Sequence, residues 1–226
     1  YTTCMNDFIN EKQLEIEAKV EQFKQQPGVI VFHSLGSGKT MTAIGCGEAF
    51  PSLTKIVVVP ASLITNFKKE LNKTNTSSSK YRVYSYEMYA KTPIEKSKDA
   101  IIIVDEAHRL RNSSSATASS CIERIQGAFK VLFLTGTPII NHPADISPLV
   151  NIINKKRNAP LLPNNRTSFE DQFFNVVVQR NTVNKKFLGI KYGTKLGEPY
   201  KIISPKNLET FYEATKDIVS SYENFN

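Results

Sequence analysis

The stretch GVIVFHSLGSGKT (28–40) decides the fold. Residues 28–33 are a short run of apolar and β-branched residues, which is typical of a strand buried on both faces of a parallel sheet. Residues 34–40 are rich in small side chains and end in a Lys-Thr pair that opens a helical pattern. Strand, glycine-rich turn and helix in this order form a concave loop of backbone N–H groups that suits a phosphate. The sequence therefore predicts a phosphate-binding loop at 34–40.

The residue types in this loop match the chemistry of a nucleotide. We expect Lys39 to reach the β- and γ-phosphates and the Thr40 hydroxyl to hold Mg²⁺. His33 stands where the common form of the motif has its first glycine, and we expect it to end the strand beneath the loop. A plain glycine-rich turn with an exposed lysine is the alternative interpretation. Three small residues let the backbone approach a polyphosphate closely: Gly36, Ser37 and Gly38.

A second chemical signal is AIIIVDEAH (100–108), an apolar run that ends in two adjacent carboxylates. Because ligands bind at the carboxyl ends of strands in α/β sheets, we expect this pair on the same edge as the phosphate loop. Asp105 is placed to hold Mg²⁺ through water, and Glu106 to orient and deprotonate an attacking water. An acidic pair also begins many ordinary loops, so the prediction of nucleotide hydrolysis depends on both signals together.

Apolar runs alternate with helix-like stretches over the first 155 residues, which predicts βαβ units. We expect an α/β fold with a mostly parallel sheet flanked by helices. The expected strands are 28–33, 55–59, 81–86, 100–104 and 129–134, and the expected helices are 11–25, 39–50 and 62–71. We divide the chain into a helical N-terminal segment (1–27), the sheet lobe (28–155) and a basic, helical or irregular C-terminal extension (156–226).

Two helices are expected in the extension. Thr167 and Glu170 form a capping-box pattern for a helix that runs to about Val178. Ser204-Pro205 is typical of the start of a second helix. The apolar residues expected on one side of that second helix are Leu208, Phe211, Tyr212, Ile218 and Val219.

Charge and composition limit the partners. The chain carries a net charge of +8, and residues 155–195 contain nine bases and two acids. This basic stretch fits either a polyanion such as nucleic acid or a solvated loop. No apolar run is long enough to span a membrane, so we expect no membrane partner. Three cysteines without paired spacing argue against a disulfide framework or zinc site and favour an intracellular location.

Three motifs taken together resemble superfamily two helicases, and within them the Swi/Snf-type DNA translocases. They are HSLGSGKT (33–40), VDEAHRLRN (104–112) and LTGTPIIN (134–141). The stretches 57–71, 83–89 and 142–153 resemble further segments of the same family, in the same order. The His before the loop and the compact spacing resemble a viral branch that includes poxvirus nucleoside triphosphatase I and early transcription factor.

The resemblance implies a RecA-like first lobe that binds Mg-ATP through its phosphate loop and hydrolyses it with Asp105 and Glu106. It implies that His108 connects the ATP site to the nucleic-acid site. It also assigns two groups of residues. The coupling group is Thr135, Gly136 and Thr137, and the group facing a nucleic-acid backbone is Pro60, Ala61 and Ser62.

Two departures from the family pattern shape the expectation. The Tyr-Gln pair that contacts adenine is not evident in 1–27, and the Gln-x-x-Gly-Arg-x-x-Arg stretch of a second lobe is not found. We therefore expect a first lobe plus linker of a longer polypeptide, with a second RecA-like lobe as partner. Because arginine fingers contribute roughly 10³–10⁵ in rate, the chain alone should hydrolyse ATP barely, if at all.

Three functions stay open. The first is the motor lobe of a DNA-dependent ATPase, which the stretches LTGTPIIN and VPASL favour, with transcription machinery as a further partner. The second is an RNA helicase lobe with the same chemistry. The third is a non-catalytic interaction module on an ATPase fold. The expected location is the nucleus for a cellular protein, or the virion or cytoplasmic factory for a viral one.

Overall fold

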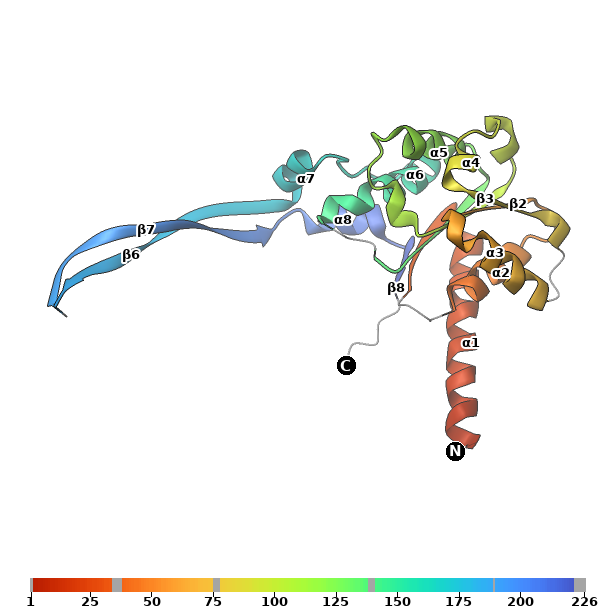
Figure 1. Ribbon diagram of the computed structural model, residues 1–226, viewed down its shortest axis with the longest axis horizontal. Helices are drawn as coiled ribbons and strands as arrows, with labels where there is room; N and C mark the ends of the chain where they lie inside the picture. Colours follow the sequence, from red (N-terminus) through yellow and green to blue (C-terminus); the bar gives the residue numbers. More distant parts are fainter. Residues whose placement is uncertain (1, 34–37, 75–77, 138–140, 189, 222–226) are drawn as a thin grey trace.

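A six-stranded sheet in the order β3-β2-β4-β5-β1-β8 forms the centre of the molecule (Figure 1). The computed structural model describes residues 2–33, 38–74, 78–137, 141–188 and 190–221. All paired strands of this sheet run parallel, as the sequence predicts. The strands are β1 (Gly28–Phe32), β2 (Lys55–Val59), β3 (Tyr81–Ser85), β4 (Ile101–Asp105), β5 (Lys130–Thr135) and β8 (Val219–Ser221).

Helices cover both faces of the sheet (Figure 1). One face carries α1 (Thr2–Gln25), α2 (Lys39–Glu48) and α3 (Ile64–Lys73), and the other carries α4 (Tyr86–Tyr89), α5 (Ala116–Gln126) and α6 (Ser147–Arg157). Short 3₁₀ turns connect them: η1 (Ala61–Leu63), η2 (Ser78–Lys80), η3 (Ile94–Ser97), η4 (Ala107–Leu110) and η5 (Pro143–Ile146). No helix among the described residues combines the length and apolar character that crossing a membrane requires.

The strands divide their side chains between two cores, because successive residues of a strand point to opposite faces. In β4, Ile102 and Val104 pack toward α5 and α6, whereas Ile101 and Ile103 pack toward α2 and α3. All four are buried. Burial on both faces explains why the strands are continuous apolar runs rather than alternating ones, and why those runs were recognisable in the sequence.

A buried lysine fixes the C-terminal end of α1 against the sheet. Lys130 Nζ donates hydrogen bonds to the carbonyl oxygens of Phe23, Lys24 and Gln26 at 2.9, 2.9 and 2.5 Å. Its ammonium also lies 5.4 Å from the ring centroid of Phe50 and 5.9 Å from that of Phe129. The cation thus satisfies carbonyl groups that a helix C-terminus leaves without partners. Burial lowers the pKa of Lys130.

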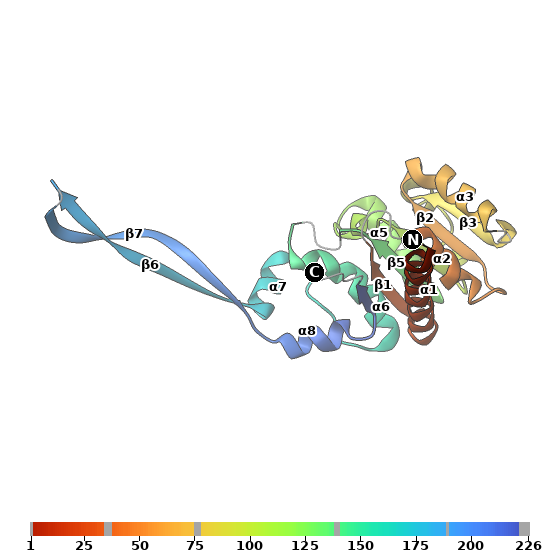
Figure 2. The ribbon, with the colours of Figure 1, turned by 90° about the horizontal axis from the view of Figure 1, so that it is seen from below.

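The extension differs most from expectation, since its centre is a long antiparallel hairpin. Strand β6 (Phe174–Phe187) pairs with β7 (Ile190–Pro205), and the two run away from the lobe in both views (Figures 1 and 2). We call residues 174–205 the arm. The prediction of a helical or irregular extension is therefore wrong here. The cause is local, because Val176–Val178 shows no alternation and the turn at Leu188 lacks the usual Asn-Gly or Asp-Gly signal.

The helices on either side of the arm are shorter than predicted. Helix α7 (Arg166–Phe173) ends before Val178, and its N-cap is Asn165, whose side chain accepts from the Ser168 N–H at 2.8 Å, rather than Thr167. Helix α8 (Leu208–Thr215) begins after Asn207, while Ser204-Pro205 belongs to β7. Pro205 is tolerated there because it is the last residue of a strand in a ribbon that has only edges.

Helix α8 docks on α6 through polar contacts as well as through the buried Ala214. Asn154 Nδ2 donates to the Ala214 carbonyl at 2.8 Å, and Arg157 donates to the carbonyls of Ala214 and Lys216. Of the expected apolar face, Phe211 and Ile218 pack against the core, whereas Leu208 and Tyr212 are exposed, so that prediction is correct only in part. Residues 219–221 then return to the sheet as β8 and pair with β1, so the end of the extension is part of the lobe.

The substitution Lys130→Met should detach the end of α1. It leaves one buried and two partly buried carbonyl oxygens without their donor, so we expect the free energy of unfolding to fall by about 2–4 kcal/mol. Urea unfolding followed by circular dichroism measures this. Lys91→Met, at an exposed lysine, is the control and should change stability little. Equal stability of the two variants would show that Lys130 does not hold the helix.

Candidate active site

The site lies where β1, β4 and β5 end side by side. The His33 N–H donates to the Thr135 carbonyl at 3.0 Å, which joins the residue after β1 to the end of β5. A Cβ at Gly136 would lie 3.0 Å from the His33 carbonyl oxygen, so the close approach of these two backbones favours glycine there. His33 is buried, and burial together with the charges of Lys19 and Lys39 lowers its pKa to about 4.

The start of α2 is shaped to receive an anion. Gly38 is the N-cap residue and adopts a left-handed conformation (φ 83°), which glycine reaches without strain. It has no side chain to satisfy the first N–H groups of the helix, so these groups and the positive end of the helix dipole are available to a phosphate. Gly36 and Ser37, which the sequence also assigns to this loop, lie outside the described residues.

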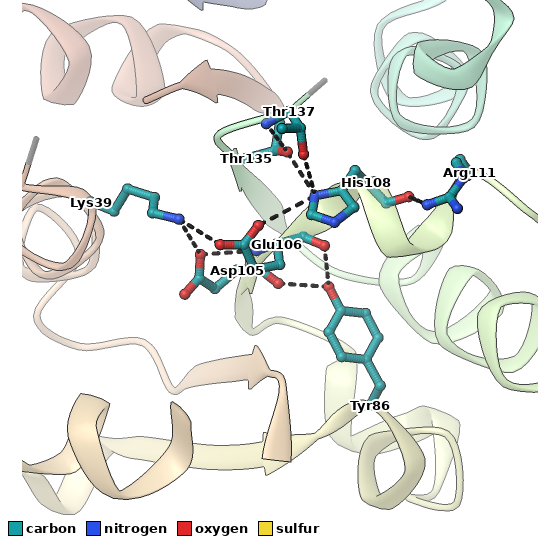
Figure 3. A network of polar contacts seen from close by, with 8 residues as sticks. All are labelled: Lys39, Tyr86, Asp105, Glu106, His108, Arg111, Thr135 and Thr137. Carbon is teal, nitrogen blue, oxygen red and sulfur yellow. Dashed lines mark hydrogen bonds and ion pairs between the residues drawn. The ribbon is translucent and has the colours of Figure 1, made fainter. Parts of the chain in front are cut away.

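Lys39 points into the carboxylate pair (Figure 3). Its Nζ lies 2.7 Å from Glu106 Oε1 and 3.7 Å from Asp105 Oδ1. Burial alone would lower the pKa of Lys39, but the hydrogen bond to Glu106 and the two negative charges outweigh it, and the pKa is raised. The lysine is therefore a permanent cation at this edge of the sheet. Burial raises the pKa of Asp105, although Lys39 opposes this.

Glu106 is held in a strained backbone conformation. It has φ 52° and ψ 45°, in the left-handed region that costs a non-glycine residue ~1–2 kcal/mol. Its N–H donates to Asp105 Oδ1 at 2.9 Å. The Tyr86 hydroxyl donates to the backbone carbonyls of Asp105 at 2.7 Å and Glu106 at 3.1 Å (Figure 3). Tyr86 thus clamps the turn that directs both carboxylates toward Lys39.

His108 lies between the carboxylates and the end of β5. Its Nδ1 is 3.3 Å from Glu106 Oε2, 3.0 Å from Thr135 Oγ1 and 3.3 Å from Thr137 Oγ1. Burial and the nearby Arg111, Arg109 and Lys39 lower the pKa of His108, against the pull of Glu106, so the ring is neutral at pH 7. The Thr137 N–H also donates to Thr135 Oγ1 at 3.2 Å. His108 Nδ1 therefore contacts side chains of two motifs, the acidic motif at 104–112 and the motif at 134–141.

The three residues expected to face nucleic acid lie apart from this network. Pro60 follows β2, and Ala61 and Ser62 form the exposed start of η1. Strand β2 is the neighbour of β4, so these residues occupy the same carboxyl edge as Asp105. The structure brings Lys39, Asp105, Glu106, His108, Thr135 and Thr137 into direct contact, and leaves Pro60, Ala61 and Ser62 beside them.

The donor set suits a magnesium nucleotide. Mg²⁺ is usually held by one or two carboxylates together with substrate phosphates and water. The Thr40 hydroxyl at the start of α2 and the half-buried Asp105 carboxylate provide this kind of donor, and Lys39 provides a counter-charge for phosphate. Among the described residues, no group of three or more His, Cys, Asp or Glu side chains could hold a metal ion.

Sheet, glycine-capped helix and carboxylate pair together form a RecA-like lobe. Comparison with known families agrees: residues 81–188, just under half of the chain, match the SNF2-related domain. The resemblance to the Swi/Snf-type family is confirmed.

Viral proteins are among the relatives. An ATP-dependent RNA helicase candidate of Acanthamoeba polyphaga mimivirus is 32% identical over 204 residues, which is 88% of this chain and 44% of that protein. The termination factor NPH-I homolog of African swine fever virus is 28% identical over 171 residues, covering 63% of this chain and 24% of that protein. The chain thus spans less than half the length of either relative.

A solved structure shares the fold. The Sulfolobus solfataricus SWI2/SNF2 ATPase core in complex with dsDNA superposes with a TM-score of 0.54 at 19% identity, covering 72% of this chain and 38% of that one. At this level of identity the likeness concerns the fold alone. It confirms the RecA-like architecture predicted from the sequence.

Tyr86 is the functional residue that sequence reasoning missed. Its place in the stretch YRVYSYEMY (81–89) suggested either packing or stacking on bases. Three of the four tyrosines there are buried, namely Tyr81, Tyr86 and Tyr89, so packing is correct for them. Nothing local in the sequence signals that the Tyr86 hydroxyl reaches two carbonyl groups 19 and 20 residues away.

The substitution Tyr86→Phe tests whether Tyr86 positions the turn at Glu106 or only stabilises the fold. It removes the single O–H donor that the carbonyls of Asp105 and Glu106 share, so we expect the free energy of unfolding to fall by about 1–2 kcal/mol. Because the turn at Glu106 loses its clamp, kcat should also fall in a longer chain that includes the second lobe, with the Kd for nucleotide unchanged.

Tyr89→Phe is the matched control for this variant. Tyr89 is fully buried, and its hydroxyl lies 2.7 Å from Ser97 Oγ instead of contacting the turn at Glu106. It should lose similar stability and keep its kcat. Equal loss of kcat in both variants would show that Tyr86 acts through general stability alone.

Proposed function

We propose that this chain is the first lobe of a nucleic-acid-dependent ATPase motor, and that it needs a second lobe for rapid turnover. The observation that carries the proposal is the continuous contact from Lys39 through Glu106 and His108 to Thr135 and Thr137. This chain of side chains runs from the phosphate-binding helix to the segment that the family resemblance assigns to coupling.

The contacts of Lys39 suggest how nucleotide binding changes the site. Glu106 Oε1 lies 2.7 Å from the Lys39 ammonium and neutralises it. Phosphate oxygens arriving at the start of α2 would replace Glu106 as the partner of Lys39, because they carry more negative charge and lie along the helix dipole. Glu106 is thereby released from its ion pair. The residue can then accept hydrogen bonds from another donor.

The released Glu106 is the proposed general base. Its carboxylate would orient a water molecule and accept the proton as that water attacks the terminal phosphorus. The bond from this phosphorus to the bridging oxygen would break, so that ADP leaves with that oxygen and inorganic phosphate is formed. Thr40 and Asp105 would hold Mg²⁺, which supplies charge neutralisation on the phosphate oxygens. Glu106 Oε2 also contacts His108, and His108 contacts Thr135 and Thr137. A shift of the Glu106 carboxylate would therefore change the contacts of both threonines. This is the proposed route between hydrolysis and nucleic-acid movement.

The substrate strand is proposed to be DNA, contacted through its backbone. Support comes from the resemblance of LTGTPIIN and VPASL to DNA translocases, and from the solved relative that was captured with duplex DNA. The mimivirus relative carries the name of an RNA helicase, so an RNA-dependent motor is the alternative. In either case Pro60, Ala61 and Ser62 are proposed to face the sugar-phosphate backbone.

The proposed setting is viral transcription. A relative from African swine fever virus is named as a homolog of a termination factor, which supports a partnership with transcription machinery. The proposed location is accordingly intracellular, in the virion or a cytoplasmic viral factory, with the nucleus as the alternative for a cellular protein.

The substitution Lys39→Ala should abolish nucleotide binding, because it removes the counter-charge for the phosphates. Binding of a fluorescent ATP analogue in the presence of Mg²⁺ measures this on the chain itself. Lys91→Ala removes an exposed lysine away from the site and should bind as the parent does. A Lys39→Ala variant that binds normally would contradict the assignment of the phosphate site.

ATPase activity in a chain extended through the second lobe tests the function as a whole. We expect duplex DNA to stimulate turnover, the isolated lobe to remain nearly inactive, and Glu106→Gln in the extended chain to bind nucleotide without turning it over. Stimulation by single-stranded RNA alone would overturn the DNA assignment. Unchanged turnover in Glu106→Gln would mean that another group is the base.

A further inference from the structure

The arm (174–205) is built as a projection with no packed face. A strand of 14 residues spans roughly 46 Å, and Figures 1 and 2 show this ribbon leaving the lobe. Every side chain described between 175 and 205 is exposed except Gly197, which is half-buried. A two-stranded ribbon alone in water is marginally stable at best. The arm is therefore expected to gain stability from a partner.

The charge of the arm identifies the chemistry of that partner. The arm contains six basic residues, three on each strand, and one acid, Glu198. Among the side chains that the structure describes there, no ion pair joins a base to a carboxylate. The basic residues are Arg180, Lys185, Lys186, Lys191, Lys195 and Lys201.

One pairing within the arm is unfavourable unless an anion is present. Lys186 and Lys191 are direct cross-strand partners near the turn, and both are exposed. Like charges directly opposite each other in an antiparallel pair are destabilising. An anion bound between them would remove this cost. Because further bases follow on both strands toward the lobe, the anion that fits is a repeating one.

We propose that the arm binds duplex DNA, lying along the major groove with its lysines directed at the phosphates on either side. The major groove is about 12 Å wide and admits a two-stranded ribbon, whereas the major groove of duplex RNA is too narrow for side chains to read. This inference rests on the proposed function and adds to it a second DNA contact, remote from the ATP site.

Apolar residues at the root of the arm could instead favour a protein partner. Val176, Val177 and Val178 on β6 are exposed, as are Ile202 and Ile203 on β7. They lie at the end nearest the lobe. At the outer end, Lys185, Lys186 and Lys191 stand beside two exposed apolar residues of the turn, Leu188 and Ile190. The proposal concerns the outer end because the unpaired bases gather there.

The experiment compares two triple variants with equal loss of charge. In the arm variant, Lys185→Gln, Lys186→Gln and Lys191→Gln are combined. In the control, Lys91→Gln, Lys96→Gln and Lys98→Gln are combined at exposed positions of the lobe near η3. Fluorescence anisotropy with a labelled DNA duplex of about 24 base pairs gives Kd for each between about 50 and 300 mM KCl.

A plot of the log of the DNA-binding constant against the log of salt concentration has a negative slope. We expect the arm variant to reduce the magnitude of this slope by about 2–3, because each phosphate contact contributes about 0.9. The control should leave the slope nearly unchanged, and replacing the same three arm lysines by arginine should restore it. A duplex RNA of equal length should bind the parent chain more weakly and respond less to the arm variant.

Four results would overturn the proposal. These are an equal slope in the parent and the arm variant, equal losses in the arm and control variants, equal arm dependence with duplex RNA, and no binding of duplex DNA by the parent chain. Binding of a fluorescent ATP analogue by the same proteins keeps the two claims apart. An arm variant that binds nucleotide normally leaves the ATP site assignment standing whatever the DNA result.

Discussion

The ion pair between Lys39 and Glu106 is the interaction on which the site depends. Its two residues come from opposite sides of β5, one at the start of α2 and one after β4, and they meet because three parallel strands end at one edge. Both side chains are largely shielded from water, so each would be costly there without the other. The ion pair therefore holds the Lys39 ammonium beside a negative charge, and in the proposed function a phosphate replaces Glu106 as that negative charge.

The residues of the site were predictable because their chemistry is written in short motifs at strand ends. Parallel topology then accounts for the meeting of Lys39, Asp105, Glu106 and His108 at one edge. Backbone conformations, and hydrogen bonds from hydroxyl groups distant in the sequence, could not be predicted. Neither the left-handed turn at Glu106 nor its clamp by Tyr86 follows from any local pattern, since both arise from how β3 and β4 are placed around β2.

The fold, too, has elements that the sequence predicts and elements that it does not. Strands buried on both faces are continuous apolar runs, and five of them were placed within a residue or two. Strand β8 has only three residues, and its pairing with β1 is a long-range event that no local signal announces. The arm was missed for a different reason. Polar and basic residues interrupt the Val and Ile residues of β6 and β7, and β7 also contains two prolines. The turn at Leu188 takes a left-handed φ of 48° that a leucine seldom adopts.

The pairing of β8 with β1 has a consequence for how the chain is made. Ile30 pairs with Val219, about 190 residues later, so β1 keeps one open edge while nearly the whole lobe emerges from the ribosome. That edge lies beside the most apolar strands of the sheet and is a template for wrong pairing during synthesis. A loop of this length is expected to close late, because its closure costs more chain entropy than the local contacts do. Of the strands in this sheet, β1 comes first along the chain and is thus the last to be fully paired.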